Sequence, residues 1–493
     1  MKDRAVVIGS GVAGMAAAIR LAVAGLDVQV FEKNDYPGGK LSAFSLNGFH
    51  FDAGPSLFTE PWLLQELFEL SGEDISDFLH IRPVKKACTY FFREKVIDAW
   101  TDRDQFADEL ERKVGEPAVN VHRYLKRSEK LYKGAAAIFL NESLHRPSTW
   151  LKRKTIRSLF ATPLSMLRTG LHDHNRKEFR TAEACQIFDR FATYNGSDPF
   201  RTPAIMSVIP HLEHNTGIWY PDGGMISITD ALYRLALKKG VRFHFGSEVT
   251  RIIHSGGTAS GIVVEHVNIP ADVVISNMDV YFTYKKLLLN DHAAKKNAKQ
   301  ERSSSALVFY WGMNREFPML GLHNIFFSED YKKEFQGIFK NSIPDDVTVY
   351  INITSRENKE HAPAGMENWF VMINVPSNRG QNWTVIKERV RRLVLSKLEK
   401  MLGTDVEQHI IEERVMDPVK IASDTMSYQG ALYGTSSNSA MAAFVRHSNY
   451  APGVKGLYFC GGSVHPGGGI PLCFRSAAIA TGMIKRKLNV ESR

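Results

Sequence analysis

The chain has 493 residues, a formal net charge of +9 and 44% hydrophobic residues, a composition typical of a globular protein of about three domain equivalents. Its four scattered cysteines form no CxxC pair, which argues against a disulfide framework, a structural zinc and a dithiol redox centre, and favours a reducing, cytoplasmic location. Lys2 and Arg4 precede an apolar run as in a signal peptide, but Arg20 interrupts it. No uncharged apolar stretch reaches about eighteen residues, so neither export nor a spanning helix is expected.

The first predicted elements are a buried strand, a glycine turn, a helix and a second strand within residues 4–32. In the Gly-x-Gly-x-x-Gly turn, Gly9 allows the tight turn, Gly11 lets backbone approach a pyrophosphate, and Gly14 lets the helix pack on the strand. The helix N-terminus suits a diphosphate. Glu32 ends the second strand, where a carboxylate can accept hydrogen bonds from a ribose. The unit predicts an adenine dinucleotide site.

The next elements are two glycine-containing turns, at 37–40 and 51–56, around a short β segment. Residues from about 60 to 210 are predicted to be mainly helical. A helix, a hairpin and a further strand are expected to follow, over 226–239, 241–267 and 271–276.

Residues from about 304 to 440 show a mixed pattern, with strand-like runs and a long amphipathic helix over 384–402. The last fifty residues return to a strand, a glycine cluster and a helix over 475–488. The predicted fold is α/β, with a Rossmann-like cofactor domain assembled from three pieces and two inserted regions. The cofactor domain is expected at 1–75, 215–290 and 445–493, a mainly helical region at 76–214, and a mixed α+β substrate region at 291–444.

No second Gly-x-Gly-x-x-Gly turn follows a strand in this sequence. Enzymes that pass electrons between flavin and nicotinamide on one chain often carry two such units. A single unit accompanied by scattered glycine turns favours one tightly held cofactor, FAD rather than NAD. A nicotinamide dehydrogenase stays open as an alternative.

Six blocks along the chain carry a resemblance to a known family. They are VVIGSGVAGMAAAIRLAVAG (6–25), VFEKNDYPGGK (30–40), FHFDAGPSLF (49–58), HLEHNTGIWYPDGGM (211–225), VISNMD (274–279) and LYFCGGSVHPGGGIPLCFRSA (457–477). On these blocks the sequence resembles the FAD-dependent carotenoid desaturases of the phytoene desaturase type, within the amine oxidase–like flavoproteins. The WYPDGGM and HPGGGIP blocks are the most specific.

The resemblance implies a set of FAD-binding residues. In the resemblance, Gly9, Gly11 and Gly14 match the diphosphate turn, Glu32 the ribose carboxylate, and Gly39 and Lys40 a second cofactor turn. Gly54, Pro55 and Ser56 match a turn near the flavin, and Val249 matches a strand residue at the adenine. The segment that passes the isoalloxazine ring is matched by Gly461, Gly462, Gly469, Pro471 and Leu472.

One loop departs from the common family pattern. Residues 465–472 read HPGGGIPL where phytoene desaturases usually read HPGAGIPG, and this is closer to the branch that desaturates 1-hydroxycarotenoids at C3–C4. The resemblance thus implies hydride transfer from an allylic C–H to flavin N5 in carotenoid biosynthesis. A desaturase of phytoene or of C30 diapophytoene is the nearest alternative.

Loss of the accompanying proton needs only a weak base, because the allylic cation is delocalised over a polyene. The candidates lie in residues 211–214, where Glu213 matches the family's carboxylate and is the predicted catalytic residue. A salt-bridged structural role for Glu213 is the alternative. His211 and His214 lack visible partner ligands, so no metal is expected.

Residues 146–177 hold eight Lys or Arg residues and one acid, Asp173. Apolar residues recur among them at helical spacing, with Trp150 at the margin: Ile156, Leu159, Phe160, Leu164, Leu167 and Leu171. Cationic amphipathic segments with aromatic anchors lie on anionic membranes. We therefore expect a peripheral protein on the inner membrane face, although a packed helix with a solvated basic face would show the same pattern. No motif points to nucleic acid.

Two further classes stay open. A flavin amine or porphyrinogen oxidase shares the first glycine turn but not the HPGGGIP block or the basic segment. A non-enzymatic lipid-chain carrier of the GDP-dissociation-inhibitor type uses a related fold without flavin, and retention of the turn glycines and Glu32 counts against it. For the terminal electron acceptor, oxygen and membrane quinone are both compatible with the sequence.

Overall fold

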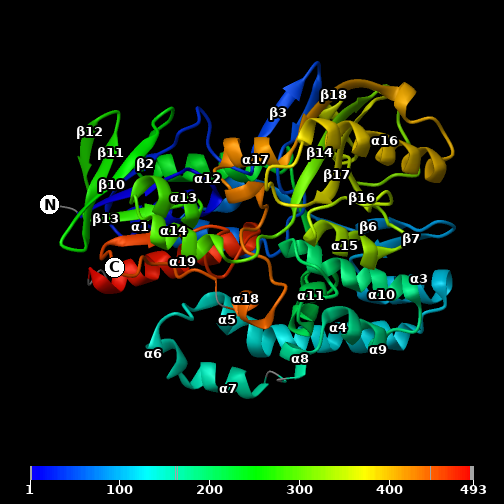
Figure 1. Cartoon of the computed structure of the whole chain (residues 1–493), viewed down its shortest axis with the longest axis horizontal. Helices are drawn as coiled ribbons and strands as arrows, with labels where there is room; N and C mark the ends of the chain where they lie inside the picture. The colour runs from blue at the N-terminus through cyan, green and yellow to red at the C-terminus, as the bar shows by residue number, and fades with distance from the viewer. Residues whose placement is uncertain (1–2, 162, 164, 445, 489–493) are drawn as a thin grey trace.

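The computed structural model describes residues 3–161, 163, 165–444 and 446–488 (Figure 1). One centre of the fold is a parallel sheet with the strand order β19-β13-β1-β2-β9. Its strands come from widely separated stretches of chain: β1 (Arg4–Ile8), β2 (Asp27–Phe31), β9 (Arg242–His244), β13 (Val273–Ser276) and β19 (Leu457–Phe459).

Both faces of this parallel sheet are covered, as its apolar strands require. Ala5 and Val7 of β1 pack against one cluster, whereas Val6 and Ile8 point into another. The first cluster contains residues of α1 (Val12–Val23), α2 (Trp62–Leu70), α12 (Ile226–Lys238) and α19 (Ile470–Lys487). The second contains residues of β10 (Val249–Ser255), β11 (Thr258–Val264), α13 (Val280–Phe282) and α14 (Asp291–Ala298), and β12 (Val267–Pro270) pairs with β11.

The second centre is a seven-stranded mixed sheet with the order β18-β14-β17-β16-β15-β6-β7. Its strands are β6 (Lys86–Phe91), β7 (Val96–Trp100), β14 (Ser305–Met313), β15 (His323–Phe326), β16 (Val349–Asn352), β17 (Glu367–Val375) and β18 (Ile410–Met416). Leu307, Phe309 and Trp311 pack with the apolar face of α16 (Trp383–Leu402). Since side chains alternate along a strand, Ala306 and Val308 lie on the opposite face.

A group of helices forms the lower part of the molecule in Figure 1. They are α3 (Arg103–Val114), α4 (Ala118–Leu131), α5 (Ala137–Asn141), α6 (Pro147–Trp150), α7 (Arg153–Ala161), α8 (Ser165–Arg168), α9 (Leu171–Glu178), α10 (Ala182–Asp189) and α11 (Ile209–His214). The remaining elements named here are β3 (Ala43–Leu46), β4 (Phe49–Asp52), β5 (Ile81–Val84), β8 (Ile218–Pro221), α15 (Tyr331–Phe339), α17 (Pro418–Thr425) and α18 (Ala440–Phe444).

The α/β fold class is confirmed, with differences in detail. The expected helical stretch from 60 to 210 was wrong for β5, β6 and β7. β5 and β6 pair with the distant strands β8 and β15, and β7 pairs with β6. The expected hairpin over 241–267 includes only β10 and β11, because β9 joins the parallel sheet beside β2. The domain limits stay a prediction.

Across the described part of the chain, every helix is too short or too polar to span a lipid bilayer.

Candidate functional site

A cavity of about 610 Å³ lies between the two sheets. Its lining runs from the carboxyl end of β1 and the turns that follow the parallel strands to the face of the seven-stranded sheet opposite α16. The carboxyl edge of a parallel α/β sheet is where such folds bind ligands. The volume of the cavity falls within the usual range for small-molecule sites, roughly 300–1,000 Å³.

The N-terminus of α1 opens into this cavity. Gly9 has φ +94°, and Gly11 is the N-cap residue, with no side chain bonded to the first helical turn. A Cβ at Gly14 would lie 2.2 Å from the carbonyl oxygen of Gly9, and one at Gly11 would lie 2.6 Å from Oδ1 of Asn277. The turn is therefore open only because these residues lack side chains, and its backbone N–H groups suit a diphosphate.

Glu32 ends β2 at the same edge of the sheet and lines the cavity. Its Oε2 accepts hydrogen bonds from the backbone N–H and the hydroxyl of Ser10 (2.8 and 2.9 Å), and its Oε1 accepts one from the backbone N–H of Asn34. These contacts fix the orientation of the carboxylate at the edge of the cavity. Val249, at the start of β10, also lines the cavity.

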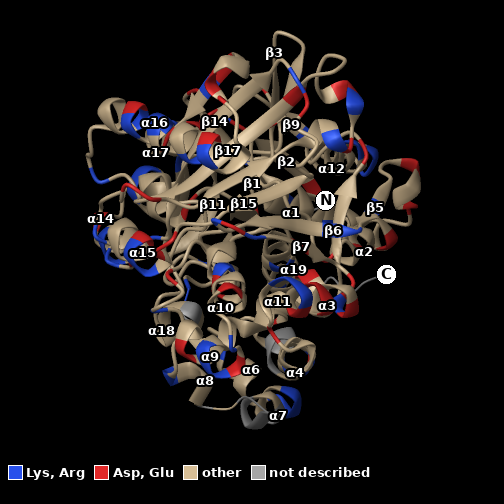
Figure 2. Cartoon of the chain, turned by 90° about the vertical axis from the view of Figure 1, so that its right-hand side faces the viewer, with Lys and Arg blue, Asp and Glu red and all other residues tan. Residues whose placement is uncertain are grey.

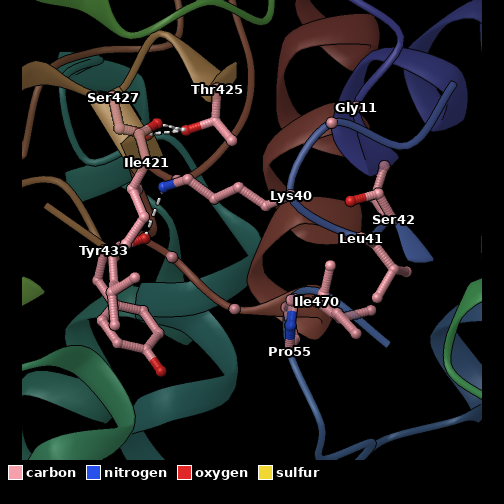
Figure 3. Close-up of a pocket in the computed structure, with 18 of the residues that line it drawn as sticks. Gly11, Lys40, Leu41, Ser42, Pro55, Ile421, Thr425, Ser427, Tyr433 and Ile470 are labelled. Carbon is pink, nitrogen blue, oxygen red and sulfur yellow. Dashed lines mark hydrogen bonds between the residues drawn. The ribbon is translucent and has the colours of Figure 1, made fainter. Parts of the chain in front are cut away.

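Lys40 crosses the cavity from the second glycine turn, as Figure 3 shows. Its Nζ donates a hydrogen bond to the carbonyl oxygen of Leu432, at 2.8 Å, and burial lowers the pKa of the ammonium group. A Cβ at Gly54 would lie 1.7 Å from the carbonyl oxygen of Lys40, so this turn must carry glycine. Gly39, Pro55 and Ser56 line the cavity beside it.

The last glycine cluster leads into α19, whose N-terminus also opens into the cavity. Gly461 and Gly469 have φ of +109° and +113°, and Gly469 is the N-cap residue without a capping side chain. Gly462 and Pro471 line the same wall. Of the predicted FAD-binding residues, Gly14 and Leu472 do not line the cavity. Gly14 instead lets α1 approach the turn.

These observations fit an FAD molecule. Two uncapped helix N-termini, a glycine turn that side chains would block, and an oriented carboxylate all face one cavity. The N-terminal partial charge of α1 suits the diphosphate, and that of α19 suits negative charge on a reduced flavin.

Glu213 of α11 lies in the wall of the cavity and is buried. Nη2 of Arg190 is 3.0 Å from both of its carboxylate oxygens, and the hydroxyl of Tyr194 donates to Oε2. Burial alone would raise the pKa of Glu213, but the Arg190 guanidinium, His214 and these hydrogen bonds outweigh it and hold the pKa below its ordinary value. The group is therefore a carboxylate at neutral pH.

His211 and His214 do not line the cavity. The His214 ring stacks on Phe106 with centroids 4.2 Å apart, and the His211 ring packs against Tyr132. Within residues 211–214, the cavity lining includes Glu213.

Arg190, Tyr194, His323 and Tyr350 line the cavity and were not predicted. Arg190 begins a short helix, η3 (Arg190–Asn195), directly after α10. The acidic Asp189 precedes it, and no local pattern marks Arg190 as a cavity residue. His323 and Tyr350 meet only through the pairing of β15 with β16, for which the sequence offers no local signal.

Among the described residues, one group has potential metal-ligating atoms within 4.8 Å of one another: His172, Cys185 and Asp189. Nδ1 of His172 lies 2.6 Å from Oδ2 of Asp189, and Asn175 donates to Oδ1 at 2.8 Å. The group is a hydrogen-bonded network within the helical region and does not line the cavity.

Among the described residues of the basic segment, the apolar side chains predicted to share one stripe differ in burial. Trp150, Leu151 and Ile156 are exposed beside Lys152–Lys154, whereas Leu171 is buried at the start of α9. Figure 2 shows basic residues on α7, at the lower end of the molecule. Leu164, and the side chains of Arg157, Leu159 and Phe160, lie outside what the structure describes.

The chain matches the family described as flavin containing amine oxidoreductase over residues 12–482. It is 47% identical over 483 residues to a 1-hydroxycarotenoid 3,4-desaturase from Flavobacterium sp. (strain P99-3), with 98% of this chain and 99% of that protein covered. It is 32% identical to a 4,4'-diapolycopene oxygenase from Methylomonas sp., with 95% of each chain covered.

A solved oxidoreductase from Methanosarcina mazei superposes with a TM-score of 0.63 at 18% identity, covering 98% of this chain and 100% of that one. At this identity the likeness concerns the fold alone. The family match over most of the chain, together with a cavity that fits FAD, identifies the function at the level of chemistry. The chain is an FAD-dependent oxidoreductase that belongs to the flavin-containing amine oxidoreductase family.

Proposed function

We propose that this enzyme desaturates the C3–C4 bond of an acyclic, 1-hydroxylated carotenoid end group. The name of its 47% identical relative supports this choice, since that relative is matched over nearly its whole length. The relatives named as 4,4'-diaponeurosporene oxygenases are less similar, at 30% and 32% identity.

The observation that carries the proposal is the apolar wall of the cavity. Ala306, Val308, Ile325, Phe370 and Met372 project from neighbouring strands of the seven-stranded sheet into the cavity that the glycine turns enter. The sheet residues in this lining include no carboxylate. A long polyene would bury its apolar surface here, whereas an amine substrate would meet no counter-charge on this wall.

Desaturation removes a hydride from an allylic carbon and a proton from the adjacent carbon. Bound FAD supplies the two-electron acceptor for this oxidation. The N-terminus of α19 would favour negative charge on the bound cofactor. An Oε atom of Glu213 accepts the proton. A carboxylate of lowered pKa is a weak base, but it suffices because the allylic cation that loses the proton is a strong acid.

We further propose that the enzyme is peripherally attached to an anionic membrane surface through residues 146–177, on the cytoplasmic side. Exposed Trp150 and Leu151 would enter the interface, and Arg153 and Lys154 would meet the headgroups. Each basic residue near such a surface contributes about 1 kcal/mol. Attachment would give access to the apolar substrate and to membrane quinone as electron acceptor, with oxygen as the other candidate.

The experiment is an anaerobic incubation of the purified FAD enzyme in liposomes with three polyenes: a 1-hydroxylated acyclic carotenoid, phytoene and C30 diapophytoene. Each is tested with and without quinone. The expected result is a mass loss of two hydrogens and a red-shifted spectrum for the hydroxylated substrate. Conversion of phytoene or the C30 polyene in its place would overturn the substrate assignment. A colourless protein that takes up no FAD would overturn the enzyme assignment.

A matched aerobic arm with 4,4'-diaponeurosporene separates the oxygenase branch. A product that gains oxygen at a terminal methyl group, without conversion of the hydroxylated substrate, would place the enzyme with its 30–32% identical relatives.

A further inference from the structure

The seven-stranded sheet contributes polar as well as apolar side chains to the cavity, and two of the polar ones form a hydrogen-bonded chain with Ser56. The hydroxyl of Tyr350, on β16, lies 2.7 Å from Oγ of Ser56 and 2.8 Å from Nδ1 of His323, on the neighbouring strand β15. All three residues line the cavity. His323 is 3% exposed, so its polar atoms meet either protein or the contents of the cavity.

The hydrogen bonds around His323 determine which nitrogen carries the proton. Nδ2 of Asn352 donates to the carbonyl oxygen of Leu322 at 2.9 Å, which orients its amide group. The same NH₂ group lies 3.2 Å from Nδ1 of His323. Nδ1 is therefore an acceptor, and the neutral ring carries its proton on Nε2. Burial lowers the pKa of His323 to about 4, so the ring stays neutral at physiological pH.

With this tautomer, the two hydrogen bonds that link Ser56, Tyr350 and His323 run in the same donor-to-acceptor order. Tyr350 donates its proton toward Nδ1 of His323 and accepts one from the hydroxyl of Ser56. The chain then presents two unused groups: the Nε2–H donor of His323, to which no described residue is hydrogen-bonded, and lone pairs on Oγ of Ser56. His323 lines the cavity, so a ligand atom that accepts a hydrogen bond from Nε2–H can replace solvent there.

We propose that Ser56, Tyr350 and His323 form the binding subsite for the hydroxyl group of the substrate end group. This inference rests on the proposed function. A hydroxyl both accepts and donates, and so matches the Nε2–H of His323 and Oγ of Ser56 together.

The chemistry of the reaction also requires the subsite to lie near the reacting bond. The hydroxyl is carried on C1, and C3 is separated from C1 by a single carbon atom. The hydroxyl-binding group must therefore lie beside the place where the C3–C4 bond is oxidised. Ser56 belongs to the turn whose Gly54 packs on the backbone of Lys40, inside the predicted flavin region. The apolar sheet residues would take the rest of the polyene.

The test compares kcat/KM for a 1-hydroxylated acyclic carotenoid and for the same polyene without the hydroxyl group. Sites built around a substrate hydroxyl reject analogues that lack it, so the wild-type enzyme is expected to prefer the hydroxylated polyene by roughly a hundredfold or more. His323→Phe and Tyr350→Phe should each lower this preference by about tenfold or more, through a lower kcat/KM for the hydroxylated polyene alone.

Ile325→Val is the matched control, because Ile325 lines the cavity from the same strand as His323 and has no polar atom. It should change kcat/KM for both polyenes by the same factor. FAD absorbance per protein verifies that each variant is folded. A wild-type enzyme that converts both polyenes equally well, or a His323→Phe variant that keeps the full preference, would overturn the subsite and leave the desaturase activity standing. Conversion of neither polyene would overturn the proposed function, and the subsite with it.

Discussion

The buried pair of Arg190 and Glu213 provides a sharp test of whether the cavity wall has a structural or a chemical role. Glu213→Gln keeps the shape of the side chain but removes the charge that faces Arg190. Arg190→Met removes the other partner. The double variant Arg190→Met/Glu213→Met replaces the pair by apolar side chains of similar length. Together the three variants separate the stability of the fold from the transfer of a proton.

The magnitude follows from the geometry. At 3.0 Å and an effective dielectric constant of about 20, the attraction between the two charges is about 5 kcal/mol. Removing both groups from water costs several kcal/mol for each ion, so the pair as a whole contributes little to stability. Losing one partner leaves the other charge buried, and each single variant should lose about 3–5 kcal/mol of unfolding free energy. The double variant should lie within about 1–2 kcal/mol of the wild type.

The two readouts are urea unfolding of the FAD-bound enzyme and the rate of flavin bleaching in an anaerobic single turnover. If Glu213 accepts the proton, the double variant should regain stability but should remain at least about a hundredfold slower than the wild type. FAD content is measured in parallel, so that lost cofactor is not mistaken for lost chemistry.

Recovery of the wild-type single-turnover rate in the double variant would refute the role of Glu213 as proton acceptor. Full stability in both single variants would refute the premise that the pair is buried and mutually compensating.

Three other predictions concern separate parts of the molecule. Gly14→Ala should abolish FAD retention because its Cβ would lie 2.2 Å from the backbone carbonyl oxygen of Gly9, in the glycine turn. Gly482→Ala in α19, whose Cβ meets nothing within 4 Å, should keep FAD and gain about 0.5–1 kcal/mol of stability; absorbance spectra and urea unfolding check both variants. The double variant Leu151→Glu/Ile156→Glu should weaken flotation with anionic vesicles by about tenfold or more without changing FAD content, since the two side chains are 79% and 42% exposed. Unchanged flotation would argue against this attachment surface. Burial lowers the pKa of His447 to about 4, so the stability that its neutral ring contributes is complete above the unfolded-state pKa of about 6.5 and is lost as pH falls toward 4. In urea unfolding, His447→Gln should flatten this decline of unfolding free energy with falling pH. An unchanged pH dependence would contradict the reasoning.

Local sequence was sufficient to predict several turns that line the cavity, where the backbone geometry depends on single residues. At Gly9 and Gly469 the backbone has positive φ, and at Gly54 a Cβ would meet the carbonyl of Lys40. Each of these conformations requires glycine at one position, so it can be recognised in the sequence. The runs of buried residues in β1, β14 and β17 were predictable for the same reason, since hydrophobic periodicity reports burial directly.

Prediction was weaker where pairing between distant segments decides the structure. β6 lies within a stretch expected to be helical, but it pairs with β15, more than two hundred residues later, and contributes Ala87 and Cys88 to the cavity lining. The basic segment illustrates the same limit, because its helical spacing could not show that Leu171 turns inward while Leu151 stays exposed.

The sequence by itself determined an α/β oxidoreductase with one FAD, because glycine turns, a helix N-terminus and the carboxylate of Glu32 are specified by residues close together in the chain. Only the tertiary structure decided what faces that cofactor. Arg190 meets Glu213, and Tyr350 meets both His323 and Ser56, through contacts between separate elements. The contact with Arg190 lowers the pKa of Glu213, and burial lowers that of His323. The distances between residues far apart in sequence, and the burial of their polar groups, are set only in the folded chain. These quantities would determine which substrate binds.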